Sequence, residues 1–426
     1  MRSDYLLLRK KIETAYIIHV ILYILLIIFA FFANSPTEIL SGLIKIIINS
    51  DILITDYIYL AGIGATFINL SLLGLLCIYF FIHFNCKASG RTIMALWLLT
   101  GFAMFGKNIF NVWPILIGVW LYSKFKDEPL SKYIVTAILG TSLAPTVSLF
   151  SFFSGVHIML GLLIGFLVGI CIGFILPPIA EHCINVHFGF NLYNIGFAGG
   201  IIAMAVTSLL RAVGHDFDIR LLWYSGNNTI FALIMFGISI YFIFCSLIIG
   251  KDRKKIFSDF KSINNSHGKM PSDFFFNYNS SCYFNMGLLG LISTSFVLLI
   301  KGDLNGPTMG AIFTMIGFGC FGKNIINVIP VMIGASLAAI VSISAINSPS
   351  TVVAIMFSTG LAPISGYFGW KYGIIAGFIH VFIVSNVGYM HGGLNLYNNG
   401  LACGFVAMLM IPVIASIKNI DLKIFR

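Results

Sequence analysis

The stretch that decides the fold is Phe105-Gly-Lys-Asn-Ile-Phe-Asn-Val-Trp-Pro-Ile-Leu-Ile-Gly118, because the chain contains it twice. It returns as Phe321-Gly-Lys-Asn-Ile-Ile-Asn-Val-Ile-Pro-Val-Met-Ile-Gly334, with 10 of 14 positions identical. A second stretch, Asn191-Leu-Tyr-Asn-Ile-Gly-Phe-Ala-Gly-Gly-Ile-Ile-Ala-Met204, returns from Asn395 to Met408 with 9 of 14 identical. The copies are displaced by 216 and 204 residues. This duplication predicts two homologous halves, at residues 1–215 and 216–426.

The composition identifies the solvent of these halves. Hydrophobic residues make up 58% of the chain, charged residues only 9%, and the mean hydropathy is +0.97. Soluble domains carry about 25% charged residues, so we predict an all-α integral membrane protein in contact with the lipid bilayer. The net charge of +10 then indicates basic cytoplasmic loops and gives no reason to expect nucleic acid as a partner. The eight cysteines show no Cys-x-x-Cys spacing, so we predict no metal site.

Apolar segments divide the chain into about 14 transmembrane or re-entrant helices, seven in each half. In the first half they lie near 16–33, 58–83, 92–105, 108–123, 133–154, 156–178 and 189–210. In the second half they lie near 222–249, 280–300, 307–321, 324–344, 351–367, 371–390 and 395–416.

Basic residues predict the orientation of the chain. They gather at the N-terminus, in loops 86–91, 124–132 and 251–269, and at the C-terminus. The positive-inside rule puts all of these in the cytoplasm. Loop 251–269 has a net charge of +4, whereas its counterpart at 36–56 has −2. Equivalent loops with opposite charge bias belong on opposite faces, so we predict an inverted repeat. A parallel duplication in which one apolar segment per half does not span is the alternative.

Two lysines lie within long apolar stretches. Lys107 and Lys323 have no carboxylate in the same or an adjacent predicted span. An unpaired ammonium at membrane depth is costly and marks a ligand path, unless the lysine extends along the helix to the headgroups. Each lysine precedes Asn, Pro and Gly at i+4, i+7 and i+11, a spacing that predicts one shared helical face.

The proline of each copy predicts a break in a helix. Pro114 cannot donate to the carbonyl of Phe110, nor Pro330 to that of Ile326. We therefore predict pairs of short helices that meet at the Phe-Gly-Lys-Asn turn, either at the far face or as re-entrant pairs near mid-depth. The helix that begins there directs its positive dipole end, and the lysine, at the site, which favours anions or hydrogen-bond acceptors.

The second repeated stretch supplies amides. The spacing of Asn191 and Asn194, and of Asn395 and Asn398, places each pair on one helix face beside Tyr193 or Tyr397. The nearby glycines allow close helix approach, and His187 and His391 occupy matching positions. The predicted substrate-binding residues are Lys107, Asn108, Asn111, Asn191, Tyr193, Asn194, Lys323, Asn324, Asn327, Asn395, Tyr397 and Asn398.

The Phe-Gly-Lys-Asn-x-x-Asn-Val-x-Pro and His-x-Gly-x-Asn-Leu-Tyr-Asn-x-Gly patterns, with Leu-Ala-Pro between them, resemble a bacterial family of polytopic membrane proteins of unknown function, family 1576. The resemblance covers essentially the whole chain and implies a bacterial inner membrane, but no activity; the cytoplasmic location of both termini is predicted from the basic residues alone. Tyr-Asn-x-Gly in each half is also similar to a stretch of urea transporters, which have inverted halves.

These features predict a transporter or channel for a small polar solute, anionic in our first hypothesis, with a central site between the inverted halves and no cofactor. A channel for a neutral amide such as urea is the alternative. An integral membrane enzyme is the second alternative, but the predicted spans contain no His, Glu and Asp constellation for catalysis. Both a monomer and a homo-oligomer are compatible with the sequence.

Overall fold

The computed structural model describes residues 2–153, 155–216, 220–250 and 252–425, with side chains from residue 14. These residues form helices, joined by loops that contain two isolated β-bridges, Thr55 with Leu222 and Asp273 with Phe321. The all-α prediction is therefore confirmed for the described chain. Lys251 and Arg426, which entered the prediction of cytoplasmic loops, lie outside the described residues.

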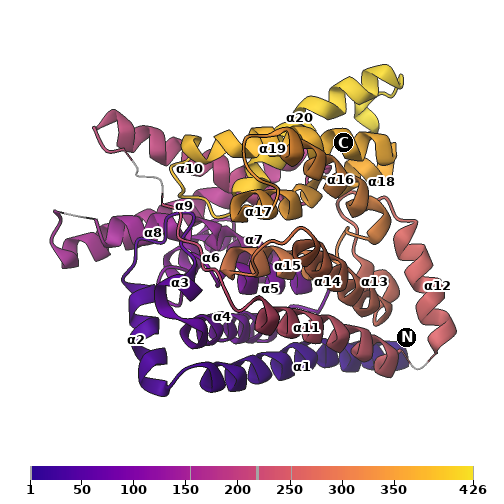
Figure 1. Cartoon of the computed structure of the whole chain (residues 1–426), viewed down its shortest axis with the longest axis horizontal. Helices are drawn as coiled ribbons and strands as arrows, with labels where there is room; N and C mark the ends of the chain where they lie inside the picture. Colours follow the sequence, from indigo (N-terminus) through magenta and orange to yellow (C-terminus); the bar gives the residue numbers. More distant parts are fainter. Residues whose placement is uncertain (1, 154, 217–219, 251, 426) are drawn as a thin grey trace.

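The helices follow one another in matching order in the two halves (Figure 1). The first half contains α1 (Arg2–Ala33), α2 (Pro36–Ile47), α3 (Tyr57–Ala61), α4 (Ile63–His83), α5 (Gly90–Phe102), α6 (Trp113–Phe125), η1 (Leu130–Lys132), α7 (Ile134–Gly140), η2 (Thr141–Leu143), α8 (Ala144–Ser151), α9 (Ile158–Val186) and α10 (Asn194–Ala212). The second contains α11 (Asn228–Ile249), α12 (Arg253–Asn264), α13 (Phe274–Tyr278), α14 (Ser281–Leu299), α15 (Gly306–Phe318), α16 (Ile325–Val341), α17 (Pro349–Ser358), η3 (Thr359–Leu361), α18 (Ala362–Phe368), α19 (Trp370–Met390), α20 (Asn398–Ile417) and η4 (Leu422–Phe425).

Ten segments of the described chain are long and apolar enough to cross a membrane. They are α1 from Thr14, α4, the continuous run α7–α8, α9, α10, α11, α14, the run α17–α18, α19 and α20. The four other predicted elements are the short helices α5, α6, α15 and α16. A helix of 13 residues, such as α5, is about 20 Å long, less than the roughly 30 Å of a hydrocarbon core. Multiple membrane spans are thus supported, and the count of 14 stays a prediction.

The centre of the molecule is the crossing of α5 and α15, one helix from each half. Gly101 and Gly310 meet there: a Cβ on either would lie 2.6 Å from the carbonyl oxygen of the other. Gly317 packs in the same way against Trp97, since a Cβ on Gly317 would lie 2.4 Å from the Cβ of Trp97. Nearly all side chains of the two helices are buried. Small residues let these two backbones approach closely, which is how helices gain packing energy without a hydrophobic driving force.

A second close contact joins the starts of α10 and α20. A Cβ on Gly196 would lie 3.0 Å from the Cα of Gly400, its equivalent in the other half. Gly200 packs against Leu401, and Gly404 against Phe197. The prediction that these glycines serve close helix packing is confirmed, and the contact brings the two Asn-Leu-Tyr-Asn segments together.

Two aspartates, one in each half, accept hydrogen bonds from the first residue of a helix in the other half. Asp56 accepts a hydrogen bond from the backbone N–H of Gly306, the first residue of α15, at 3.1 Å. Its equivalent, Asp273, accepts one from the N–H of Gly90, the first residue of α5, at 2.8 Å. Because the first N–H groups of a helix have no partner within it, each half satisfies a helix start of the other. The contacts are reciprocal, as in a pair related by a two-fold axis.

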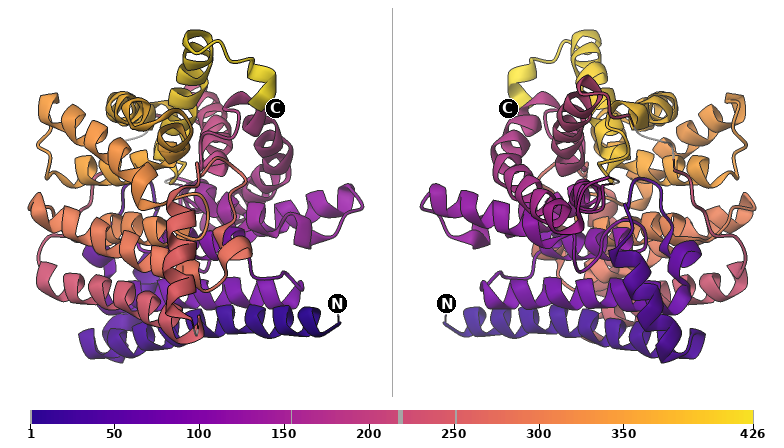
Figure 2. Two further views of the ribbon diagram at one scale, coloured as in Figure 1. Left: turned by 90° about the vertical axis from the view of Figure 1, so that its right-hand side faces the viewer. Right: turned by 90° about the vertical axis from the view of Figure 1, so that its left-hand side faces the viewer.

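The equivalent helices α2 and α12 lie at opposite ends of the molecule. In Figure 1, α2 lies on the left-hand side, below α8, and α12 at the right-hand edge. Figure 2 shows the same relation, with α12 in front in its left view and α2 in front in its right view.

Candidate functional site

The two copies of Phe-Gly-Lys-Asn form tight turns, here called the lysine turns (residues 105–111 and 321–327). Gly106 has φ 119° and Gly322 has φ 90°, a left-handed conformation that favours glycine. The space beside each glycine is filled by a leucine from the other half: Leu396 lies against Gly106 and Leu192 against Gly322. Glycine is therefore required at each turn by both its backbone and its neighbour.

The asparagines of each lysine turn bind the turn itself. Asn111 Oδ1 accepts from the N–H of Asn108 at 2.9 Å, and Asn108 Oδ1 accepts from the N–H of Asn111 at 3.0 Å. Asn324 and Asn327 repeat the exchange at 2.9 Å in both directions, and there Asn324 caps α16. The side chains of Asn111 and Asn327 also donate to the carbonyls of Gly106 and Gly322. These amides hold the turn closed, whereas the lysine side chain extends to the opposite half.

The predicted helical face of Lys, Asn, Pro and Gly is wrong in the first half. There α6 begins only at Trp113, so Lys107 and Asn111 precede the helix and Pro114 lies in its first turn. A proline in the first turn removes an N–H that has no helical acceptor anyway, so no helix is broken there. In the second half Asn327, Pro330 and Gly334 do lie on α16, which begins just after the lysine.

Two further asparagines, Asn69 and Asn285, hold the lysine turns from outside. Asn69 Nδ2 donates to the carbonyls of Ala103 and Lys107 at 2.7 and 2.8 Å. Asn285 Nδ2 donates to Gly319 and Lys323 at 2.8 Å each. The sequence contains a signal for this pair, since Phe67-Ile-Asn-Leu and Tyr283-Phe-Asn-Met are a weak third repeat, but we did not predict these residues as part of the site.

Each lysine reaches the tyrosine of the opposite half. Lys107 Nζ donates to the hydroxyl of Tyr397 at 2.7 Å, and Lys323 Nζ donates to that of Tyr193 at 2.5 Å. The ammonium groups lie 4.6 and 4.8 Å from the centroids of the same rings, within cation–π range. Lys323 also donates to Thr359 Oγ1 at 2.8 Å. Both lysine side chains are fully buried, and no carboxylate of the described residues forms an ion pair with either.

The Asn-Leu-Tyr-Asn segment of each half also binds the opposite half. Asn191 Nδ2 donates to the carbonyl of Gly400 at 3.1 Å, and Asn395 Nδ2 donates to that of Gly196 at 3.0 Å. The Oδ1 atoms of these asparagines accept from the N–H groups of Tyr193 and Tyr397. These bonds fix the backbone of each tyrosine against the opposite half.

The second asparagine of each segment does not share a helix face with the first. Asn191 lies in the turn before α10, and only Asn194 is helical; Asn395 and Asn398 are placed in the same way around the start of α20. Asn194 Oδ1 contacts His187 Nε2 and Asn398 Oδ1 contacts His391 Nε2, both at 2.8 Å. The histidines thus fasten the turns that carry the tyrosines.

The two lysine–tyrosine pairs are connected by aromatic rings. Phe102 lies 4.4 Å from the ring of Tyr397 and 5.4 Å from that of Phe357, which lies 6.1 Å from the ring of Tyr193 (centroid distances). The structure therefore brings the lysines, the tyrosines and Asn191 and Asn395 into one continuous cluster. The prediction that all twelve residues line a single cavity stays a prediction.

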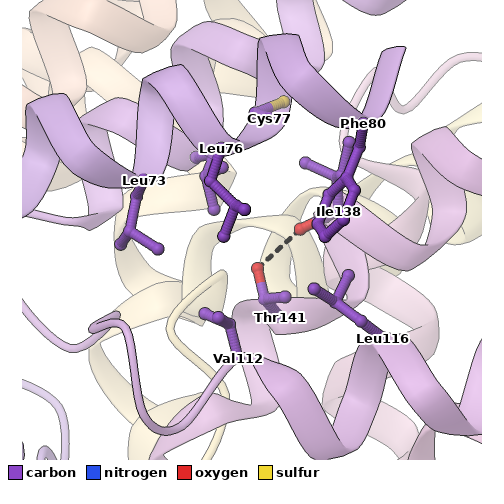
Figure 3. Close-up of a pocket in the computed structure, with 9 residues that line it drawn as sticks. Leu73, Leu76, Cys77, Phe80, Val112, Leu116, Ile138 and Thr141 are labelled. Carbon is purple, nitrogen blue, oxygen red and sulfur yellow. Dashed lines mark hydrogen bonds between the residues drawn. The ribbon is translucent and has the colours of Figure 1, made fainter. Parts of the chain in front are cut away.

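A small cavity lies beside the first lysine turn (Figure 3). It has a volume of about 10 Å³, roughly the smallest that can hold one water molecule. Its lining is apolar except for Cys77 and Thr141, and Thr141 Oγ1 donates to the carbonyl of Ile138. Thr141 opens η2 as Thr359 opens η3. The equivalent hydroxyls therefore differ, because only that of Thr359 accepts a lysine.

The chain belongs to a family described as a protein of unknown function, DUF1576, whose model matches residues 35–212 and 252–416. This confirms the resemblance in the sequence. No curated protein and no solved structure is significantly similar to the chain, so the similarity to urea transporters finds no support.

Proposed function

We propose that the protein is a membrane transporter or channel, not an enzyme, for a small polar solute, an anion in the first instance. The observation that carries the proposal is the pair of buried lysines that form no ion pair with a carboxylate in the part of the chain that the structure describes. Burying an ammonium costs several kcal/mol unless a counter-charge is nearby. A tyrosine hydroxyl and a ring face compensate only part of this cost. An arriving anion would complete the charge balance, which supports an anionic solute.

The adjacent helices support the same proposal. α10 begins at Asn194 and α20 at Asn398, each one residue after a lysine-binding tyrosine. The unpaired N–H groups and the dipole at a helix start favour negative charge. Because these two starts pack together at Gly196 and Gly400, their positive ends add to the field of the lysines.

The halves of this transporter would have inverted topology. If α5–α6 and α15–α16 are re-entrant pairs, each half has five of the ten candidate spans. Because five is an odd number, the second half begins on the opposite side of the membrane from the first. Both ends of α5–α6 then lie on the cytoplasmic side, as the basic loops 86–91 and 124–132 require. The basic α12 and the equivalent α2 at opposite ends of the molecule support the arrangement.

The topology can be tested with a matched pair of cysteines. Ser41 and Ser258 occupy equivalent, exposed positions of α2 and α12. We expect Ser41→Cys, in a cysteine-free chain, to react with an impermeant maleimide added to intact cells, and Ser258→Cys to react only after the membrane is opened. Reaction of both from the same side would contradict the inverted arrangement.

The function can be tested by removing the two charges. We expect Lys107→Gln with Lys323→Gln to reduce uptake of a panel of anions (chloride, nitrate, phosphate) into liposomes by at least a hundredfold. Lys45→Gln, at an exposed position of α2, is the control and should transport normally. Loss of most transport in Tyr193→Phe with Tyr397→Phe, which keeps the rings but not the hydroxyls, would support the same site. If the double lysine variant keeps its flux and passes urea, the neutral-solute alternative replaces the anion hypothesis.

A further inference from the structure

The two lysine turns differ at one buried carboxylate, Asp51. Its Oδ2 accepts from Asn108 Nδ2 at 2.9 Å, from Asn111 Nδ2 at 3.0 Å and from Ser148 Oγ at 2.8 Å. Its Oδ1 accepts from the hydroxyl of Tyr57 at 2.7 Å. The side chain is fully buried. Asp51 therefore connects four parts of the first half: the loop after α2, the first lysine turn, α3 and α8.

The second half has a glycine, Gly268, at the equivalent position. The neighbouring equivalents, Asp56 with Asp273 and Ile46 with Ile263, are separated by 217 residues, the same separation as Asp51 and Gly268. Both residues have left-handed φ values, 56° and 72°. A Cβ at Gly268 would lie 2.0 Å from the carbonyl oxygen of Gly322, so there the backbone itself closes against the lysine turn. A titratable connection thus exists in one half only.

The surroundings of Asp51 allow both of its protonation states. Burial raises the pKa of Asp51 to about 7, while the hydroxyls of Tyr57 and Ser148 and the charge of Arg220 act in the opposite direction. The titratable or charged groups that face it among the described residues are Tyr57, on α3, and Arg220, whose guanidinium donates to Ser50 Oγ at 3.0 Å. Lys107 belongs to the adjoining turn, but its ammonium is directed to Tyr397.

We propose that Asp51 is the binding site for a proton that is transported with the anion. The inference rests on the proposed transport function and adds the coupling ion to it. The ionised carboxylate accepts four hydrogen bonds and fastens the first lysine turn to α8 through Ser148 and Asn111. A protonated carboxyl must donate one bond, and of its four partners only the hydroxyls of Tyr57 and Ser148 can accept it. Protonation therefore reverses the bond to Tyr57 or to Ser148 and removes the negative charge that strengthens the others, which weakens the connections of the turn to α3 and α8.

Protonation also changes the charge of the first lysine turn. Removing the negative charge of Asp51 leaves Lys107 as the nearest charge of the turn, so an anion binds more favourably. By linkage, a bound anion raises the proton affinity of Asp51 by the same factor. Proton and anion therefore enter together. Because the second half lacks this carboxylate, the coupling acts on one lysine turn and gives the symmetric scaffold a functional direction.

The test compares Asp51→Asn with the control Asp127→Asn. Asp127 has nearly the same backbone conformation (φ 54°) but is exposed. Asparagine at 51 has the size of the protonated carboxyl and does not titrate. In liposomes with a pH-sensitive dye inside, a chloride, nitrate or phosphate gradient should drive proton uptake in the wild type and in Asp127→Asn. A group with a midpoint near 7 is about 90% protonated at pH 6 and about 10% at pH 8, so wild-type anion uptake should fall about tenfold between them. Asp51→Asn should transport anion without protons and with a flat pH profile.

A second measurement separates this inference from the proposed function. Since the pKa of Asp51 is raised from its ordinary 3.8 to about 7, the folded protein binds this proton more tightly than the unfolded chain. Thermal stability in detergent should therefore decline as pH rises from about 4 to about 7, and Asp51→Asn should lack this part of the decline. Tyr57→Phe removes a donor that favours the ionised form, so it should shift the midpoint upward.

The outcomes are distinct. If no anion in the panel is transported but the stability profile behaves as expected, the transport function fails and the proton site stands. If Asp51→Asn keeps the wild-type pH profile of uptake, or couples protons to anions as the wild type does, the inference is overturned. Should Asp51→Asn fail to fold, an unchanged midpoint in Tyr57→Phe would overturn it as well.

Discussion

The first and second lysine turns share a framework and differ in charge. In both, two asparagines close the turn, a third holds its carbonyls, and the opposite half supplies a leucine and a tyrosine. Among the described residues, only the first turn contacts a buried carboxylate, Asp51, and only in the second does a threonine hydroxyl, that of Thr359, accept from the lysine. The duplication has thus kept the residues that shape the turn, while those that set its electrostatics have diverged.

This difference indicates which parts of the site are structural. The contacts repeated in both halves fix the lysines relative to the contact of α10 and α20, because the asparagine that binds each tyrosine N–H also donates to a glycine carbonyl of the other half. A residue that occurs in only one half is not needed to build the turn. Asp51 is such a residue. Thr359 has an equivalent, Thr141, and differs from it only in its contact with Lys323. These two positions are where we expect function to have been added to the common framework.

The largest effect is expected when the same substitution is made in each turn separately, as the single variants Asn111→Asp and Asn327→Asp. Each removes the amide that donates to a glycine carbonyl, but the new carboxylate at 111 also lies about 3.0 Å from Asp51 Oδ2, the distance of the hydrogen bond it replaces. Two carboxylates so close cannot both be ionised without a pKa shift of about 2 units or more, roughly 3 kcal/mol. At pH 8 we expect Asn111→Asp to be less stable than Asn327→Asp by about 2–3 kcal/mol, measured by unfolding in detergent.

Two further measurements test whether repulsion between the carboxylates at positions 51 and 111 is the cause of this difference. The difference should shrink below pH 6, where the two carboxyls can share a proton, and should disappear when Asp51→Asn is added to Asn111→Asp. Equal stability of the two asparagine variants at pH 8 would mean that Asp51 is already neutral, and the comparison of the turns would lose its electrostatic basis.

The sequence predicted the membrane class, and its repeated stretches contain the lysines and tyrosines that the structure brings together. It did so because hydropathy and internal repetition depend on local runs of residues, such as Phe105–Gly118 and its copy. It did not predict that Lys107 contacts Tyr397 and Lys323 contacts Tyr193. Those contacts join residues 290 and 130 positions apart. Local spacing in the sequence does not distinguish a contact between the halves from a contact within one half.

Two other features escaped prediction for physical reasons. The helix face assigned to Lys107 and Asn111 assumed continuous helix, but a glycine with positive φ before the lysine permits a closed turn that delays α6 to Trp113. Asp51 was counted only as a loop charge, because its equivalent is a glycine and the repeat comparison gives no signal there. Burial of a loop residue depends on the whole fold and is not visible in its own segment.

The smallest effect is expected from the threonines that open η2 and η3. Thr359→Val removes a hydroxyl that accepts from Lys323 at 2.8 Å, and hydrogen bonds to charged groups contribute about 1.5–3 kcal/mol. Thr141→Val removes a hydroxyl that faces the small cavity and donates only to Ile138, three residues back, so it should cost less than about 1 kcal/mol. Unfolding in detergent and anion uptake of the two variants measure the contrast. If Thr141→Val leaves stability unchanged but lowers uptake as much as Thr359→Val, then Lys107 must reach Thr141 during transport. The two turns would then be successive states of one mechanism, with the second already in the position that the first adopts later.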